Sequence, residues 1–155
     1  MNATENRRGA RAGVLSPIFL IVAVAWAQSD VIKPRASSAE YPAQARAHGV
    51  SIGAAVAAPY RDLIVIEVAV YPPPTGSVNV TLNDFALRLN NGELVIKPAA
   101  PPDVARGTML DKGQITQPTA GYLYFSVPIP KDRRSSAELQ YFGATKILRI
   151  PLPDV

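Results

Sequence analysis

The chain contains no cysteine and only one histidine among its 155 residues. Without thiols it can form neither disulfide bonds nor thiolate metal sites. The single histidine, His48, has no carboxylate three or four residues further along, so the ligand spacing of a zinc site is missing. We therefore expect no metal ion and no other cofactor.

Phosphate-binding motifs and a strong charge of one sign are also missing. The sequence contains neither G-x-x-x-x-G-K-[ST] nor G-x-G-x-x-G. Its formal net charge is +4, and residues 1–27 account for half of that excess. A charge this small and scattered does not predict a nucleic-acid surface, so we expect no nucleic-acid partner.

The longest hydrophobic run lies close to the N-terminus. Three arginines within the first eleven residues precede an apolar run from Val14 to Ala27. The run ends in Ala25-Trp26-Ala27, the small-x-small pattern of a signal peptidase site. It is shorter than the roughly 20 residues that span a bilayer. We expect residues 1–27 to be a signal peptide cleaved near Ala27, which predicts a secreted or periplasmic protein.

A retained N-terminal segment is the alternative. In that case residues 1–27 would anchor the protein, and contact with a membrane is expected only then.

The rest of the chain divides into an arm and one domain. Residues 28–47 show no hydrophobic periodicity and are predicted to be a linker or a loosely attached arm. Residues 48–155 are predicted to form one domain. The whole chain contains 15 prolines, which argues against long helices and for strands joined by turns.

The segment Leu63–Tyr71 has the composition of a central strand. It is nine residues long, rich in β-branched side chains, and followed by three prolines. Because side chains alternate along a strand, Ile64, Ile66, Val68 and Val70 share one face. We expect this face to be the centre of the core.

Shorter segments with strand-like patterns occur on both sides of it. They are residues 49–58, 78–82, 85–89, 93–97, 121–128, 137–142 and 146–152. Asn90-Asn91-Gly92 indicates a hairpin, because Asn and Gly accept positive φ. Seven to eight short strands at regular spacing predict an all-β, antiparallel β-sandwich.

The order of these motifs resembles a known family. Leu63–Tyr71, Asp84-Phe85-Ala86-Leu87, Tyr124–Pro128 and Leu139-Gln140-Tyr141 follow one another as in the telokin-like extracellular domains of bacteria. These domains are immunoglobulin-like sandwiches of secreted proteins and lipoproteins. The resemblance covers roughly residues 50–152 and implies an immunoglobulin-like fold, but it supplies no catalytic residue. The lipid-bearing cysteine of the lipoprotein members is absent here.

One segment matches an enzyme motif. Gly49-Val50-Ser51-Ile52-Gly53 fits G-x-S-x-G, which works at a strand-to-helix turn with a downstream histidine. Here the only histidine, His48, lies upstream, and no helical pattern follows. The sequence therefore favours a non-catalytic protein, and a secreted serine hydrolase using Ser51 is the minor alternative.

Three aromatic residues are candidates for a binding surface. Tyr122, Tyr124 and Phe142 occupy positions opposite the expected core-facing residues of the last strands. Exposed aromatic patches bind peptides, sugars or proteins. The sequence predicts an exported, monomeric or weakly associating, non-catalytic module with a binding or envelope-associated accessory role, whose partner is an unidentified protein or glycan.

Overall fold

The computed structural model describes residues 32–100, 110–153 and 155. These residues form ten strands with only short 3-10 helical turns between them. The strands are β1 (Ala43–Ala47), β2 (Val50–Val56), β3 (Leu63–Tyr71), β4 (Val78–Val80), β5 (Phe85–Leu89), β6 (Leu94–Ile96), β7 (Gly113–Ile115), β8 (Thr119–Ser126), β9 (Ala137–Tyr141) and β10 (Leu148–Leu152). The predicted signal segment lies outside the described residues.

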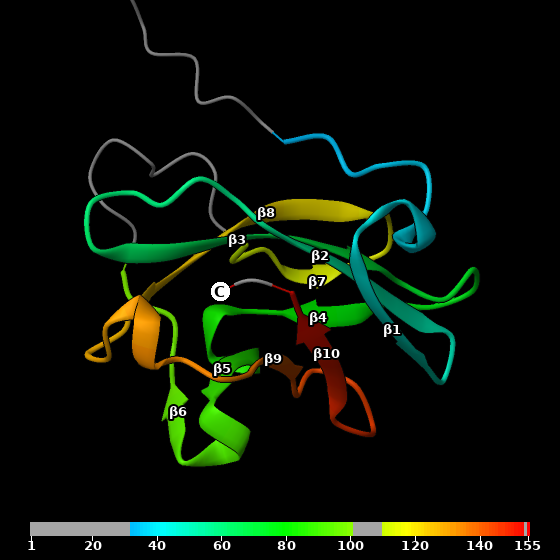
Figure 1. Ribbon diagram of the computed structural model, residues 1–155. Helices are drawn as coiled ribbons and strands as arrows, with labels where there is room; N and C mark the ends of the chain where they lie inside the picture. Colours follow the sequence, from blue (N-terminus) through cyan, green and yellow to red (C-terminus); the bar gives the residue numbers. More distant parts are fainter. Residues whose placement is uncertain (1–31, 101–109, 154) are drawn as a thin grey trace, which may run out of the picture.

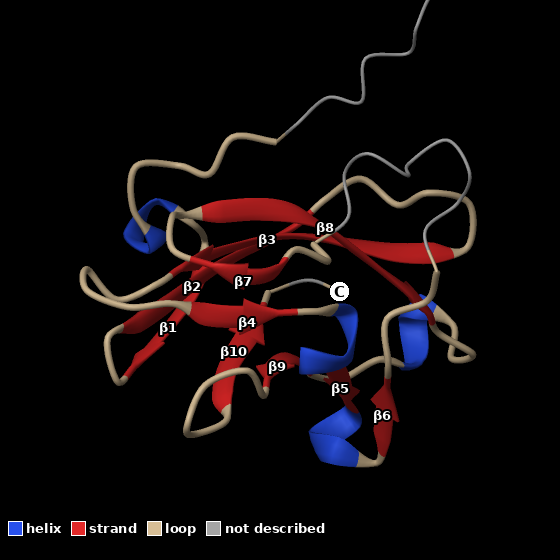
Figure 2. Cartoon of the chain, turned by 180° about the vertical axis from the view of Figure 1, so that it is seen from behind, coloured by secondary structure: helices blue, strands red, loops and turns tan. Residues whose placement is uncertain are grey.

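Two four-stranded antiparallel sheets make up the fold. The first sheet has the order β1-β2-β3-β8, and the second has the order β10-β9-β5-β6. Figure 1 shows them as two layers, with β3 and β8 in one and β5 and β9 in the other. Seen from behind in Figure 2, the pair β4-β7 lies between these layers. The predicted all-β, antiparallel architecture is confirmed, although ten strands replace the expected seven or eight.

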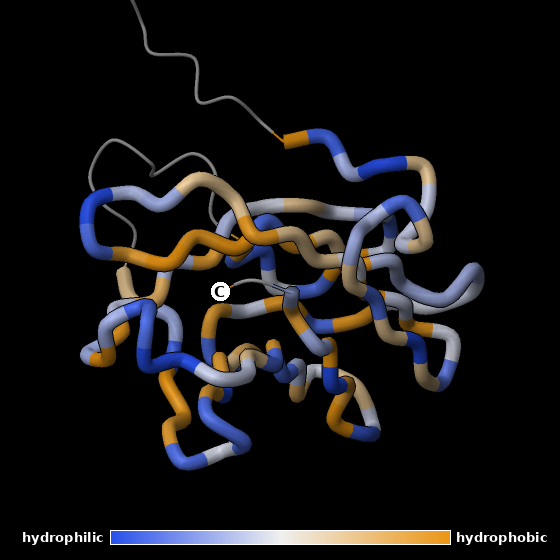
Figure 3. Tube along the Cα trace, in the orientation of Figure 1, coloured by the Kyte–Doolittle hydropathy of each residue, from blue (hydrophilic) through white to orange (hydrophobic). Residues whose placement is uncertain are grey.

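Strand β3 is central, as its sequence predicts. It pairs with β2 on one side and β8 on the other. Ile66, Val68 and Val70 are fully buried in the main hydrophobic cluster, together with Ile64. In Figure 3 hydrophobic positions follow this strand, and hydrophilic positions gather in the connecting loops. Burying four such side chains contributes roughly 8 kcal/mol of gross hydrophobic free energy.

The second sheet contains two hairpins, and the first forms where the sequence predicts it. Asn90 and Asn91 have φ of 51° and 54°, and Gly92 has φ of 97°, so the turn between β5 and β6 places three consecutive residues at positive φ. In the hairpin of β9 and β10, Leu139 lies opposite Ile150. Both of these side chains are fully buried.

The N-terminal arm differs from the prediction. Residues 43–47 are not a loosely attached linker, because they form β1 and pair along their whole length with β2. The sequence pattern is weak there because alanine buries little surface and is less frequent in strands than β-branched residues are. Strand β2 is therefore internal to the first sheet rather than its edge.

A buried tyrosine holds the arm on the outer face of the first sheet. Tyr41 is 4% exposed, and its ring occupies the space above Gly53 where any larger side chain would lie. The guanidinium carbon of Arg35 lies 4.4 Å from the ring centroid of Tyr41. The hydroxyl of Tyr71 donates to the carbonyl of Arg35 at 2.8 Å. Residues 35–41 are thus part of the folded unit.

Stability is expected to fall in alkaline solution. Burial raises the pKa of Tyr41, Tyr71 and Tyr141 above the ordinary value of 10.0. Below pH 10 these phenols are neutral in both states, whereas above it the unfolded chain ionises first. The free energy of unfolding, measured by urea titration, should therefore decrease between pH 9 and pH 11.

A matched variant assigns this effect to a named side chain. Tyr141→Phe keeps the ring that packs on Phe85 but removes the hydroxyl that donates to the carbonyl of Asn79 at 2.7 Å. Its unfolding free energy should be about 1 kcal/mol lower at pH 7 and should fall less steeply with pH. A wild-type profile that stays flat up to pH 11 would contradict the burial of these phenols.

Candidate functional site

The three aromatic residues singled out in the sequence occupy two different sheets. Tyr122 and Tyr124 lie on β8, with ring centroids 6.5 Å apart in an edge-to-face arrangement. Tyr124 is only 5% exposed. Phe142 follows β9 in the second sheet, where the ammonium of Lys97 lies 4.8 Å from its ring centroid. The structure therefore brings the two tyrosines together and places Phe142 with the other sheet; a binding role for these residues stays a prediction.

The G-x-S-x-G segment adopts an extended conformation. Ser51 belongs to the internal strand β2, where it lies opposite Arg46 of β1 and Tyr71 of β3. His48 and Gly49 form the turn before it, with φ of 49° and 80°. A nucleophile elbow needs a sharp strand-to-helix turn, and Ser51 instead lies inside a sheet.

The outer face of the second sheet carries a row of four residues in register. Val95 of β6 lies opposite Arg88 of β5, and Arg88 lies opposite Glu138 of β9. Glu138 in turn lies opposite Pro151 of β10. The row thus places a cation and an anion on neighbouring strands between two apolar residues.

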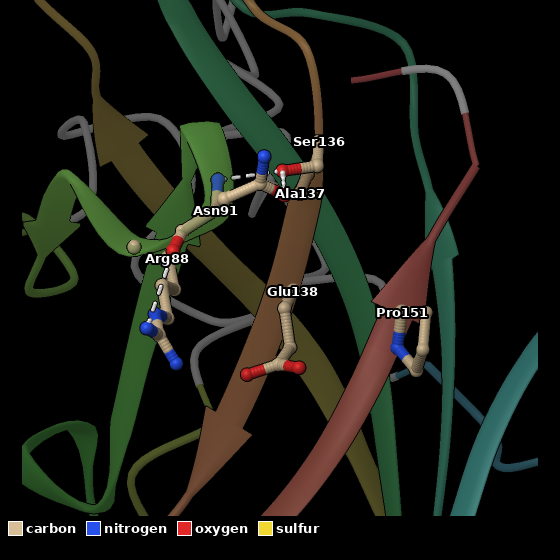
Figure 4. A pocket seen from close by; sticks show the side chains of 7 residues that line it. Arg88, Asn91, Ser136, Ala137, Glu138 and Pro151 are labelled. Carbon is tan, nitrogen blue, oxygen red and sulfur yellow. Dashed lines mark hydrogen bonds between the residues drawn. The ribbon is translucent and has the colours of Figure 1, made fainter.

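A hollow of about 300 Å³ opens at this row. Figure 4 shows Arg88 and Glu138 projecting toward it from adjacent strands, with Pro151 on the next strand. Its remaining walls come from Asn91, Gly92, Ser136 and Ala137. The two charged side chains are half-buried. This pocket, the Arg88–Glu138 hollow, is our candidate functional site.

Each charged group of the hollow is held by a neighbour on its own side. Arg88 Nη2 donates to the carbonyl of Asn91 at 3.3 Å. Glu138 Oε1 accepts from Gln140 Nε2 at 2.9 Å. Gly92 lies against the Arg88 guanidinium, so a side chain at this position would displace it. No hydrogen bond within the described residues uses the other nitrogens of Arg88 or Oε2 of Glu138, so these atoms are left for a ligand.

The upper rim of the hollow is a hydrogen-bonded pair of loops. The backbone amide of Asn91 donates to Ser136 Oγ at 2.8 Å. Ser136 Oγ donates to Asn91 Oδ1 at 3.1 Å. The Ser135 amide donates to Asn90 Oδ1 at 2.9 Å. These bonds fix the turn after β5 to the segment before β9, so the conformation of the rim is preorganised for binding.

The arrangement suits recognition of a polar group. A guanidinium binds carboxylates and a carboxylate binds ammonium or hydroxyl groups, so the hollow complements a ligand that carries both kinds of group. Within the described parts of the chain, no cluster of three or more His, Asp or Glu side chains could hold a metal ion. None of the helices in residues 32–100, 110–153 and 155 is long and apolar enough to cross a membrane.

The sequence did not single out Arg88 or Glu138. Arg88 stands at an outward position between two buried leucines, and Glu138 stands between the half-buried Ala137 and the buried Leu139, which is also the pattern of any solvated sheet face. Only the register of β5 against β9 brings them side by side, and that register was not available from the pattern of either strand alone.

Comparison with known proteins identifies no related protein. No family model matches the chain. No curated protein and no solved structure matches it either.

Proposed function

We propose that this protein is an exported, non-catalytic, immunoglobulin-like module that binds a partner through the outer face of its second sheet. The observation that carries the proposal is the Arg88–Glu138 hollow. It holds two opposite charges that each bond to their own neighbour rather than to one another.

Three further observations support it. The apolar run up to Ala27, with the small-x-small ending, favours export. The motif order over residues 50–152 resembles telokin-like bacterial domains, which are immunoglobulin-like. The one hydrolase-like motif lies in an internal strand, where Ser51 has no elbow geometry.

Site-specific photo-crosslinking tests the binding face. A benzoylphenylalanine replaces Val95, which is 55% exposed and lies opposite Arg88. In cells that make and export the protein, illumination should yield a covalent adduct with one partner. The same probe at Ile147, which is 49% exposed and is not part of the hollow, is the control and should give no such adduct.

The adduct must also depend on the charges of the hollow. Arg88→Gln and Glu138→Gln should each reduce its yield at least tenfold, because a charge-assisted bond is lost. Equal yields from Val95 and Ile147, or yields unaffected by both substitutions, would contradict the proposed face.

A further inference from the structure

A second hollow, distinct from the Arg88–Glu138 hollow, lies at the end of the molecule where β3 begins. It has a volume of about 450 Å³. One wall is the turn at residues 59–64, and the other is the connection at residues 127–134 between β8 and β9. A smaller hollow of about 100 Å³ continues it past Val56 and Val65. We call the two together the end groove.

The floor of the end groove is apolar. Ile64 is 7% exposed and belongs to the main core. Leu63, Val127 and Ile129 are half-buried beside it. A ligand with an apolar side chain would remove this surface from water, which favours binding by about 25 cal/mol per Å².

Cations stand on both walls of this apolar floor. Arg61 rises from the first wall, and Lys131 and Arg134 rise from the second. Asp62 is the one acidic side chain among the described residues that line the groove. The lining therefore carries an excess of positive charge around an apolar centre.

Arg61 occupies a position that is unfavourable for an arginine. It has φ of 52° in the tight turn closed by the Leu63 amide, which donates to the Tyr60 carbonyl at 3.0 Å. Glycine and asparagine adopt this left-handed backbone far more readily than arginine. The guanidinium carbon lies 5.4 Å from the Tyr60 ring centroid. A strained residue of this kind suggests that its side chain has a function.

Arg134 is fixed with part of its guanidinium left for a ligand. Its Nε donates to the carbonyl of Ile129 at 2.9 Å, which orients the planar group. No hydrogen bond within the described residues uses its terminal nitrogens Nη1 and Nη2. Such a fork binds a carboxylate through two parallel hydrogen bonds.

We propose that the end groove binds an acidic segment of a partner protein, in which carboxylates flank an apolar side chain. Cations on both walls match carboxylates on both sides of one apolar residue. A fatty acid or a single lipid headgroup places its charge at one end only. Pro59, Pro128 and Pro130 in the walls have no amide hydrogen, so side chains rather than backbone pairing supply the recognition.

Binding of a defined peptide tests this proposal. The probe is a fluorescein-labelled peptide of alternating glutamate and leucine, and the control peptide has glutamine in place of glutamate. Fluorescence anisotropy with the purified full chain at low salt should show at least tenfold weaker binding of the glutamine peptide. Equal binding of the two peptides, or no binding of either, would overturn the proposal.

Variants of the groove assign the binding to named residues. Arg134→Gln should weaken binding at least tenfold. Arg149→Gln removes an exposed cation from β10, outside the groove, and should change binding less than twofold. If Arg134→Gln binds like the wild type, or if vesicles of anionic phospholipid bind in its place with the same Arg134 dependence, the peptide proposal is wrong.

Arg61→Gly separates a binding role from a structural one. Glycine relieves the left-handed backbone, so the Tm should rise or stay unchanged, while peptide binding weakens at least fivefold. A lower Tm with unchanged binding would show that Arg61 serves the fold alone. This variant also keeps the proposal testable if Arg134→Gln does not fold.

Discussion

Val68→Asp is expected to unfold the protein. Val68 is fully buried at the centre of β3, between Ala54 of β2 and Gly121 of β8. Placing an unpaired carboxylate there costs several kcal/mol, which is comparable with the 5–15 kcal/mol that stabilises a typical domain. A urea titration at 25 °C, followed by circular dichroism, should then show no cooperative unfolding transition.

Val95→Asp is the matched control. The substitution is the same, but Val95 is 55% exposed on the short edge strand β6. Its unfolding free energy should lie within about 0.5 kcal/mol of the wild type. If Val68→Asp keeps the wild-type Tm, the face of β3 that we assign to the core is wrong.

Gly53→Ala is expected to destabilise the protein through a single contact. A methyl group at this position would overlap the ring of Tyr41, which lies directly on Gly53. Overpacking of this kind typically costs about 1–3 kcal/mol. Tyr41→Ala removes the buried ring itself and should cost about 3 kcal/mol or more. Urea titrations of the two variants measure both values.

The double variant separates this contact from a general effect on the strand. With Tyr41→Ala present, Gly53→Ala should cost less than about 0.5 kcal/mol or even stabilise, because alanine suits a strand better than glycine. Additive effects of the two substitutions would show that Tyr41 does not lie over Gly53.

The strongest patterns of the sequence predicted the elements that bury the most surface. Alternating β-branched residues placed Ile66 and Val68 on the core face of β3, and the structure buries both completely. Asn91 and Gly92 predicted a hairpin because left-handed backbone was required there, and both have positive φ. In these segments local preference and tertiary packing favour the same conformation.

Long-range contacts explain what the sequence could not predict. Residues 43–47 form a strand because β2 offers a partner, whereas their own alanines signal little. Glycine is needed at position 53 because the ring of Tyr41 approaches closely, a contact that the pattern of β2 does not reveal. Arg88 and Glu138 lie opposite one another because of the register between β5 and β9, which neither segment specifies alone.

The central claim is that β3 is the middle of one folded unit formed by both sheets and the arm. Native-state hydrogen exchange by NMR tests it most directly, because both neighbours of β3 protect its amides. We expect the amides of Ile66, Val68 and Val70 to exchange only through global unfolding, and the amides of β6 to exchange faster. Exchange of β3 that is as fast as that of β6 would contradict the claim.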